Sequence, residues 1–249
     1  LQFTPDVMPS DLLGFSMYQK QTGTFEYQTG AVMCNLFLGD EINRTSPKTQ
    51  SALLEVMEEG NVTVDGVTRK VPEPFVVIAT ENPAGSVGTQ LLPESQLDRF
   101  MICTSLGYPS LENEIAIVKG RQVQDDKAVL QPVINAEQLL YCKKLVEQIY
   151  MADDIYRYLC ELCQTTRTNA LIELGVSPRG SVALMRISKA IAFLHGRDYV
   201  IPGDIDEIFL DVAAHRIVRS AKAKAAKKSA ESILIEVMQN VKKPTAARR

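Results

Sequence analysis

The sequence predicts an α/β fold in which a parallel sheet sandwiched by helices is followed by an all-helical part. Two short apolar runs, residues 35–39 and 75–79, each end in polar residues, as strands buried in a parallel sheet do. From residue 110 onward apolar residues recur with helical periodicity, and glycine and proline separate the helical patterns. We therefore expect an α/β core over residues 1–108, a helical domain over residues 109–220 and a basic helical tail over residues 221–249.

The composition is typical of a globular protein. Of the 249 residues, 45% are hydrophobic and 23% are charged; no apolar stretch is long enough to cross a bilayer, and no signal-peptide pattern opens the chain. Five scattered cysteines, an odd number, favour small buried thiols in a reducing compartment. We expect no membrane span and a cytoplasmic location. Because the chain opens at Leu1 within a strand-like run, we also expect it to be the interior of a longer protein.

Charge is distributed unevenly along the chain. The net charge is −3, yet the residues from Arg216 onward contain ten Lys and Arg against two Asp and Glu. A basic tail on an acidic body can contact nucleic acid, an acidic partner or a neighbouring subunit. The alternative is a solvated helix face with a frayed end.

The first third of the chain predicts strands, one helix and a hairpin. Residues 1–30 hold short apolar segments broken by proline and glycine, with residues 24–28 as a short hairpin arm. After the strand at 35–39, Ser46 and Pro47 are favoured residues for the cap and first position of a helix, which Gly60 ends.

Alternating residues on both sides of Asp65-Gly66 predict a β-hairpin over residues 61–71. The second buried strand, 75–79, follows, and then a helical turn at 94–99 and a third strand at 100–105. Helical patterns occupy the remainder, with residues 221–228 as an exposed helix end or linker; these patterns cover residues 111–122, 136–150, 153–169, 178–196, 202–219 and 229–241.

Two adjacent carboxylates, Asp40 and Glu41, come directly after the first strand. In open α/β sheets the chemistry lies just beyond the carboxyl ends of the strands. One carboxylate there can hold Mg²⁺ or its waters, and the next can polarise a water that attacks a nucleotide phosphate. The alternative is that Asp-Glu merely ends a strand before a loop.

Three further residues fit the same chemistry in their order along the chain. Asn82 follows the second strand, where an amide can orient the attacking water. Arg99 lies beyond a loop and could reach the γ-phosphate bound by a neighbouring subunit, while Arg179 opens a helix and could contact the phosphates of its own subunit. Read singly, Asn82 could be a turn former, Arg99 a surface ion pair and Arg179 a solvated helix start.

The stretches that carry these residues resemble the MoxR family of AAA+ ATPases, from Leu1 to about Val218. The matching stretches include ATENP (79–83) and GVSPR (175–179), and the highly specific ones are DEINRTSPKTQ (40–50) with SALLEVMEE (51–59), together with LPESQLDRF (92–100). The resemblance implies an AAA+ P-loop-type core, lacking its N-terminal part, followed by a helical lid. It also implies that ATP and Mg²⁺ are the cofactors and that the hairpin 61–71 and the loop 84–93 are inserted elements facing the ring centre or a client.

The resemblance assigns a role to each candidate residue. Asp40 and Glu41 match the Walker B pair, with Asp40 at the metal; Asn82 matches sensor 1, Arg99 the arginine finger and Arg179 sensor 2. The family's phosphate-binding loop, G-x-x-x-x-G-K-[ST], does not occur in these 249 residues. Because that loop supplies the backbone cradle and the lysine for the phosphates, we expect the fragment as given to bind nucleotide poorly.

The leading hypothesis is a Mg²⁺-dependent, ATP-hydrolysing chaperone that forms a ring, with a hexamer expected, and matures or activates other proteins. The resemblance implies a von Willebrand factor A-domain protein as partner and leaves the client open. A second hypothesis is a non-hydrolysing scaffold or regulatory subunit. A third, a nucleic-acid motor, rests on the basic tail; the 6% aromatic content and the absence of Trp argue against nucleic acid as a partner.

Overall fold

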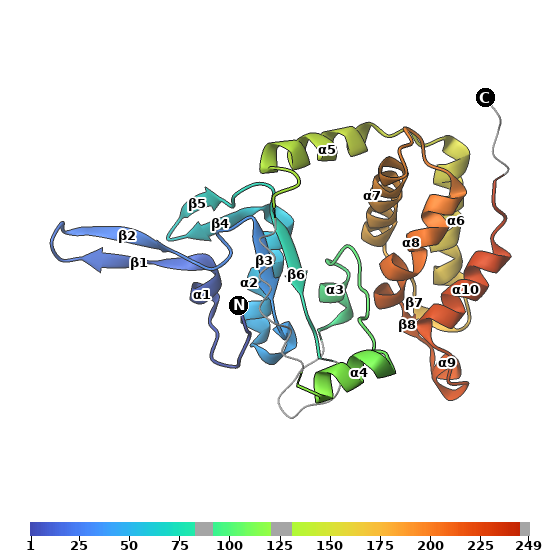
Figure 1. Ribbon diagram of the computed structural model, residues 1–249, viewed down its shortest axis with the longest axis horizontal. Helices are drawn as coiled ribbons and strands as arrows, with labels where there is room; N and C mark the ends of the chain where they lie inside the picture. The colour runs from blue at the N-terminus through green and yellow to red at the C-terminus, as the bar shows by residue number, and fades with distance from the viewer. Residues whose placement is uncertain (83–91, 121–130, 245–249) are drawn as a thin grey trace.

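The structure is a computed structural model that describes residues 1–82, 92–120 and 131–244. Figure 1 shows an α/β core, coloured blue to green, next to a helical lid, coloured yellow to red. The core contains the short sheet, helix α2 and two projecting hairpins. The lid contains helices α6, α7, α8 and α10 around a core of its own.

The centre of the α/β core is a short parallel sheet. Strand β3 (Leu36–Gly39) pairs in parallel with β6 (Val76–Ala79), which confirms both predicted strands. On the other side of β3, Gln2 forms a parallel bridge to Asp40, and the Phe3 amide donates to the Asp40 carbonyl at 2.8 Å. The strand ends that carry polar residues therefore lie at one edge of the sheet.

Only one face of this sheet is covered in the described ranges. Phe37 points inward and packs with Phe3, Leu53 and Val56, the last two from α2 (Pro47–Glu59). Leu36, by contrast, is 62% exposed on the outer face, and the other outward residues, Leu38, Val76 and Ile78, are also exposed. The expectation of strands buried on both faces is wrong for this structure, because no described element packs on the outer side.

Helix α2 begins and ends where its sequence signals predict. The Ser46 side chain accepts from the Thr49 amide at 3.2 Å and caps the first turn, with Pro47 at its first position. Gly60 adopts a left-handed conformation, with φ of 65°, and its amide closes the last turn on the Val56 carbonyl. Both ends of α2 are therefore set by residues at its own termini.

Two antiparallel hairpins extend from the core on the same side (Figure 1). Strands β4 (Asn61–Val64) and β5 (Val67–Lys70) confirm the hairpin predicted around Asp65-Gly66, and both turn residues have positive φ. Residues 24–28 belong to a longer hairpin than expected, β1 (Gly14–Gln19) with β2 (Thr24–Thr29), which follows the short helix α1 (Pro9–Leu13). The Arg69 guanidinium stacks 3.8 Å from the centre of the Tyr27 ring and joins the two hairpins.

The segment after β6 differs in part from the prediction. Helix α3 (Glu94–Leu97) confirms the helical turn, whereas residues 100–105 are not a strand. Instead of pairing with the sheet, Cys103 donates its amide to the Asp211 carbonyl of the lid at 2.9 Å. A strand requires a neighbouring strand, and no described strand pairs with this segment. Most of the loop at 84–93 lies outside the described residues.

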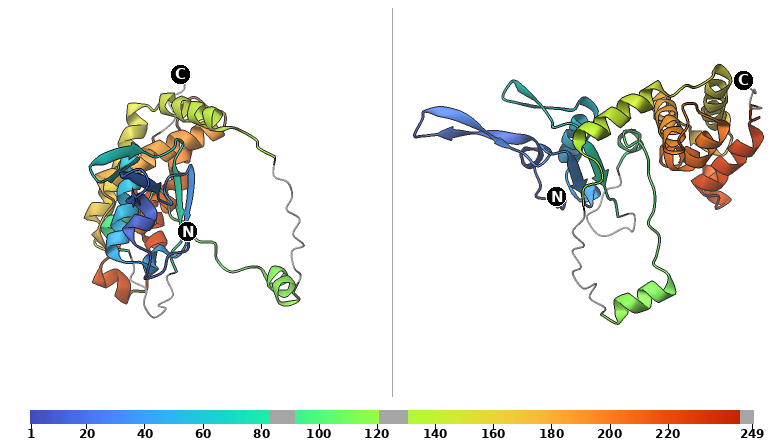
Figure 2. Two further views of the ribbon diagram at one scale, coloured as in Figure 1. Left: turned by 90° about the vertical axis from the view of Figure 1, so that its left-hand side faces the viewer. Right: turned by 45° about the horizontal axis from the view of Figure 1, so that its top comes forward.

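The predicted helices after residue 110 are all present, with shorter bounds. Figure 2 shows α4 standing apart from both the core and the lid, and α5 running between them. The helices are α4 (Leu111–Val118), α5 (Ala136–Gln148), α6 (Asp153–Thr168), α7 (Pro178–Leu194), α8 (Pro202–Ala213), α9 (Ala221–Ala225) and α10 (Ala230–Asn240).

The helix predicted over 202–219 ends at Ala213. The chain continues as a 3₁₀ turn over Ala214–Arg216 and a strand, β8 (Val218–Arg219), that pairs antiparallel with β7 (Ile172–Leu174). Helix α10 contributes buried residues to the same cluster as α6, α7 and α8; they are Ile233, Leu234 and Val237. The predicted domain limits at 108 and 220 stay predictions, but the apolar face of α10 is part of the lid core.

All five cysteines are free thiols, and among them only Cys163 is buried, so the expectation of buried thiols is correct for that residue alone. Burial raises the pKa of the Cys163 thiol, which keeps it protonated. None of the helices in the described part of the chain has the length and apolar character needed to cross a bilayer.

Candidate functional site

The ends of β3 and β6 are joined by the hydroxyl of Thr80. This hydroxyl donates to Asp40 Oδ1 at 2.5 Å and accepts from the Glu41 amide at 2.8 Å. The Thr80 carbonyl in turn accepts from the Ile42 amide at 3.0 Å. Thr80 therefore fixes the directions in which the two adjacent carboxylates leave the strand.

Glu41 is held in an uncommon conformation. Its φ of 53° places it in the left-handed region, which non-glycine residues seldom occupy. Its Oε2 accepts from Gln2 Nε2 at 2.9 Å and from Arg44 Nη1 at 2.8 Å. Backbone strain of this kind is retained where the surrounding contacts impose it, and it is concentrated at functional sites.

Asn82 is brought to the same edge by Asn43. The Asn43 side chain is buried; its Nδ2 donates to the Asn82 carbonyl at 3.1 Å and its Oδ1 accepts from the Asn82 amide at 3.4 Å. These two bonds hold the backbone of residue 82 beside the turn that follows Asp40. The structure thus brings Asp40, Glu41 and Asn82 together.

The oxygen groups at this edge fit a hard divalent cation. Mg²⁺ in nucleotide sites is bound through one or two carboxylates, with waters and phosphate oxygens completing its six ligands. Asp40 supplies such a carboxylate, and Thr80 holds it in place. The described residues contain no group of three or more His, Cys, Asp or Glu that could hold a metal by themselves. The Asp40 carboxylate suits a metal that takes its other ligands from water and phosphate oxygens.

Arg99 and Arg179 converge on a single carboxylate, that of Glu58. Arg179 Nη2 lies 2.6 Å from Glu58 Oε1, and Arg99 Nη1 binds the other oxygen, Oε2. The three residues come from different elements, because Glu58 is on α2, Arg99 follows α3 and Arg179 opens α7. They line a cavity of about 250 Å³ together with other residues, namely Met57, Asp98, Met101, Val182, Ala183, Arg186 and Arg216.

This arginine cavity lies at the other end of α2 from the carboxylates. With a rise of about 1.5 Å per residue, Glu58 is about 18 Å along the helix axis from the Ser46 cap. Asp40, Glu41 and Asn82 are not among the residues lining the cavity. The structure places Arg179 beside Arg99, and the expected contact of Arg179 with phosphates of its own subunit stays a prediction.

Asp98 connects the arginine cavity to the lid. Its carboxylate accepts from Ser177 Oγ at 2.8 and 2.9 Å and from Arg216 Nε at 3.0 Å. Ser177 also caps α7 by accepting from the Gly180 amide at 3.0 Å. Asp98 thus fixes the residue before Arg99 and the helix end that carries Arg179 in one network.

Arg216 completes this connection from a buried position, because only 1% of its side chain is exposed. Its guanidinium donates to the carbonyls of Phe100 and Met101 and to that of Val212. Burial lowers the pKa of Arg216, while the Asp98 carboxylate opposes that effect. Next to it, burial and the Arg216 charge lower the pKa of His215 to about 4, so this histidine is neutral near pH 7.

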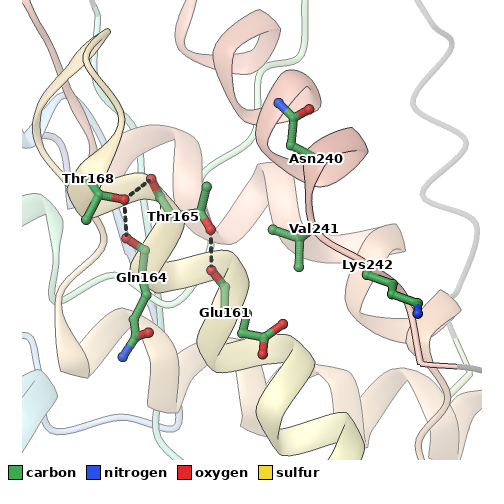
Figure 3. A pocket seen from close by; sticks show the side chains of 7 residues that line it. All are labelled: Glu161, Gln164, Thr165, Thr168, Asn240, Val241 and Lys242. Carbon is green, nitrogen blue, oxygen red and sulfur yellow. Dashed lines mark hydrogen bonds between the residues drawn. The ribbon is translucent and has the colours of Figure 1, made fainter.

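A second cavity, of about 360 Å³, lies on the lid between α6 and the end of α10 (Figure 3). The hydroxyls of Thr165 and Thr168 point to carbonyls of their own helix rather than into the cavity, at 2.7 Å for Thr165 to Glu161. Its polar groups do not converge on a common point. It is therefore a weaker candidate than the strand edge and the arginine cavity.

Sequence reasoning missed the residues that organise the site. Thr80, Asn43 and Glu58 hold the candidate residues in place, and Asp98 and Arg216 connect them to the lid. Most of them lie in the stretches that carry the family resemblance, and this was the signal that could have directed attention to them. Their partners are distant in the chain, so the local pattern alone does not assign them.

Comparisons with known proteins agree with this architecture. The family model described as "ATPase family associated with various cellular activities (AAA)" matches residues 1–102, and the model described as "AAA lid domain" matches residues 164–237. The fold and the site therefore define an AAA-type ATPase core with its lid.

The relatives make the assignment narrower. The uncharacterized protein YeaC of Bacillus subtilis is 47% identical over 98% of this chain and 76% of its own length. The chaperone MoxR1 of Mycobacterium tuberculosis is 36% identical over 98% of this chain and 67% of its own length. A crystal structure of a putative ATPase from Cytophaga hutchinsonii superposes with a TM-score of 0.88 at 35% identity, covering 98% of this chain and 77% of that one. The chain belongs to the MoxR family of AAA+ ATPases.

Proposed function

We propose that this protein is a Mg²⁺-dependent ATPase that assembles into a ring and uses ATP hydrolysis to remodel or mature partner proteins. The observation that carries the proposal is the arrangement of Asp40, Glu41 and Asn82 at one sheet edge, fixed by Thr80. Membership of a family that includes a protein named chaperone MoxR1 supports the chaperone role.

Each residue at the sheet edge has a distinct task in hydrolysis. Asp40 is the residue that would hold Mg²⁺ or its waters, and the ion would supply charge neutralisation at the phosphates. Glu41 polarises the attacking water, and Gln2 and Arg44 keep its carboxylate in one orientation. Asn82 orients the same water, with its backbone held by Asn43.

The two arginines act at a nucleotide bound by a neighbouring subunit. The meeting of Arg99 and Arg179 at Glu58, about 18 Å along α2 from the Ser46 cap, supports a role at the phosphates of another subunit. A closed ring gives every subunit such a neighbour. We propose a hexamer for this ring, with Arg99 as the arginine finger and Arg179 beside it.

Steady-state ATPase measurements on the full-length protein test the proposal. Glu41→Gln keeps the shape of the side chain but removes its negative charge, and we expect turnover to fall about 100-fold or more, the usual contribution of a general base. Glu59→Gln is the matched control, since Glu59 is exposed and forms no ion pair with any described residue. A non-hydrolysing scaffold or regulatory subunit would instead give the same background rate in all three proteins.

The partners and the location are proposals of the same kind. Light scattering after size exclusion, with and without ATP, measures whether subunits assemble into a hexamer. Co-purification with a von Willebrand factor A-domain protein tests the expected partner, and fractionation of cells tests the cytoplasmic location. A tight, salt-dependent association with DNA would instead favour the nucleic-acid motor.

A further inference from the structure

Glu58 uses its two carboxylate oxygens on two different arginines. Oε1 binds Arg179 and Oε2 binds Arg99, so the carboxylate bridges the guanidinium groups. The other acid lining the same cavity, Asp98, is engaged with Ser177 and Arg216. Among the lining residues, Glu58 is therefore the one acid that faces both arginines.

Without this bridge the two guanidinium groups would not stay together. They carry like charges, and their side chains are 34% and 44% exposed, so each is free to turn into solvent. The backbone at both positions is fixed independently, because Asp98 binds the Ser177 cap of α7 and the buried Arg216. Glu58 therefore sets the positions of the two guanidinium groups, while the hydrogen bonds of Asp98 set the positions of the backbone that carries them.

Within the described ranges, the bridge to Glu58 uses only a minority of the donors of each arginine. A guanidinium has five N–H donors, and each arginine binds Glu58 through a single nitrogen. The remaining donors can bind the oxygens of a phosphate group, for which the planar fork of arginine is well suited. Because Glu58 orders the two guanidinium groups before a phosphate binds, the entropic cost of ordering them does not fall on the reaction.

We propose that Glu58 is a positioning residue that aligns Arg99 and Arg179 as one unit for a single phosphate group of a nucleotide bound by the neighbouring subunit. The inference rests on the proposed ATPase function and adds to it a residue that contacts neither nucleotide nor metal. It also makes the two arginines a coupled unit rather than two independent contacts.

The test compares Glu58→Gln, Glu58→Asp and Glu59→Gln in the full-length protein under conditions that form the ring. We expect Glu58→Gln to lower kcat about tenfold, because misplaced groups act mainly at the transition state, and to leave KM for ATP within about twofold. Glu58→Asp keeps the charge on a shorter side chain and should recover part of kcat. Glu59→Gln, on the next residue of the same helix, should behave like the unmodified protein.

A double-mutant cycle supplies the readout that a merely structural role would not change. In the unmodified protein, Arg99→Ala and Arg179→Ala should each lower kcat, and their combination should lower it by less than the product of the two effects. In the Glu58→Gln background the two effects should become independent. The melting temperature of Glu58→Gln should stay within about 2 °C of that of Glu59→Gln, because exposed ion pairs contribute little to stability.

The outcomes separate this inference from the proposed function. Turnover in the unmodified protein with equal kcat for Glu58→Gln and Glu59→Gln would overturn the role of Glu58 alone. Loss of kcat accompanied by a large fall in melting temperature would assign Glu58 a structural role and overturn the positioning role. Absence of turnover in the unmodified protein would overturn the ATPase function, and the role of Glu58 with it.

Discussion

Arg216 and Asp98 form an ion pair across the boundary between lid and core, with Arg216 Nε 3.0 Å from Asp98 Oδ1. The two residues are 118 positions apart in the chain, and the arginine side chain is almost fully buried. Asp98 also accepts from Ser177 of α7, so one carboxylate attaches the lid at two points. This contact fixes the lid next to the arginine cavity.

Removal of the Asp98 carboxylate should destabilise the protein strongly. Asp98→Ala leaves the buried Arg216 charge without its counter-charge, and we expect the free energy of unfolding to fall by about 3 kcal/mol. Urea unfolding measures this change. Glu94→Gln, an exposed acid on the neighbouring helix α3, is the control and should change stability by less than about 0.5 kcal/mol. An equally small effect of Asp98→Ala would contradict a stabilising ion pair.

Stability should fall between pH 6.5 and 4 because of His215. Its pKa is lowered from 6.5 to about 4 in the folded protein, so the folded state favours the neutral imidazole. The stability that neutral His215 contributes is fully present above pH 6.5 and is lost as pH falls toward 4, by about 3 kcal/mol in total. His215→Gln should remove this part of the pH dependence, whereas His195→Gln, at a half-exposed histidine, should retain it. Parallel pH profiles for both variants would show that His215 is not the responsible group.

The hydroxyl of Thr80 should be required for turnover. Thr80→Val keeps the shape of the side chain but removes the bonds to the Asp40 carboxylate and the Glu41 amide, and we expect kcat to fall about 10- to 100-fold. Thr80→Ser retains the hydroxyl and should keep most of the activity. Equal kcat for the valine and serine variants would mean that the hydroxyl does not position the carboxylates.

Mixed rings should reveal which subunit supplies each arginine. The Arg179→Ala protein keeps Glu41, and the Glu41→Gln protein keeps both arginines. If Arg179 acts on a neighbour's nucleotide, a mixed ring contains some sites with Glu41 from one subunit and Arg179 from the next, so mixing the two inactive proteins restores some activity. Random assembly of equal amounts should restore about a quarter of the sites. The same experiment with Arg99→Ala should give the same result. Recovery with Arg99→Ala but not with Arg179→Ala would place Arg179 at the nucleotide of its own subunit.

The features predicted correctly from the sequence depend on local signals. Local signals act on residues only a few positions away, and they include the Ser46 cap, the Gly60 stop and the Asp65-Gly66 turn. The ends of the helix and the turn of the hairpin could therefore be predicted to within a few residues. Asp40 and Asn82 could be placed at one edge because parallel strands bring their carboxyl ends together.

The features that were missed depend on partners far away in the chain. Residues 100–105 have the composition of a strand but contact the lid at Asp211, and strand composition says nothing about whether a neighbouring strand is present. The meeting of Arg179 with Glu58 joins positions 121 apart, and each residue looks like an ordinary surface charge when read alone. Long-range ion pairs of this kind follow from the docking of the lid, which local periodicity does not encode.

The stack of Arg69 on Tyr27 connects the two hairpins to each other. It ties the long hairpin to the short one, and the short hairpin starts directly after Gly60, whose carbonyl accepts from the Val71 amide at 3.0 Å. Glu58 lies two residues before Gly60 on the same chain. The Arg69–Tyr27 stack and the Gly60–Val71 hydrogen bond therefore join the two projecting hairpins to the end of α2 that carries Glu58.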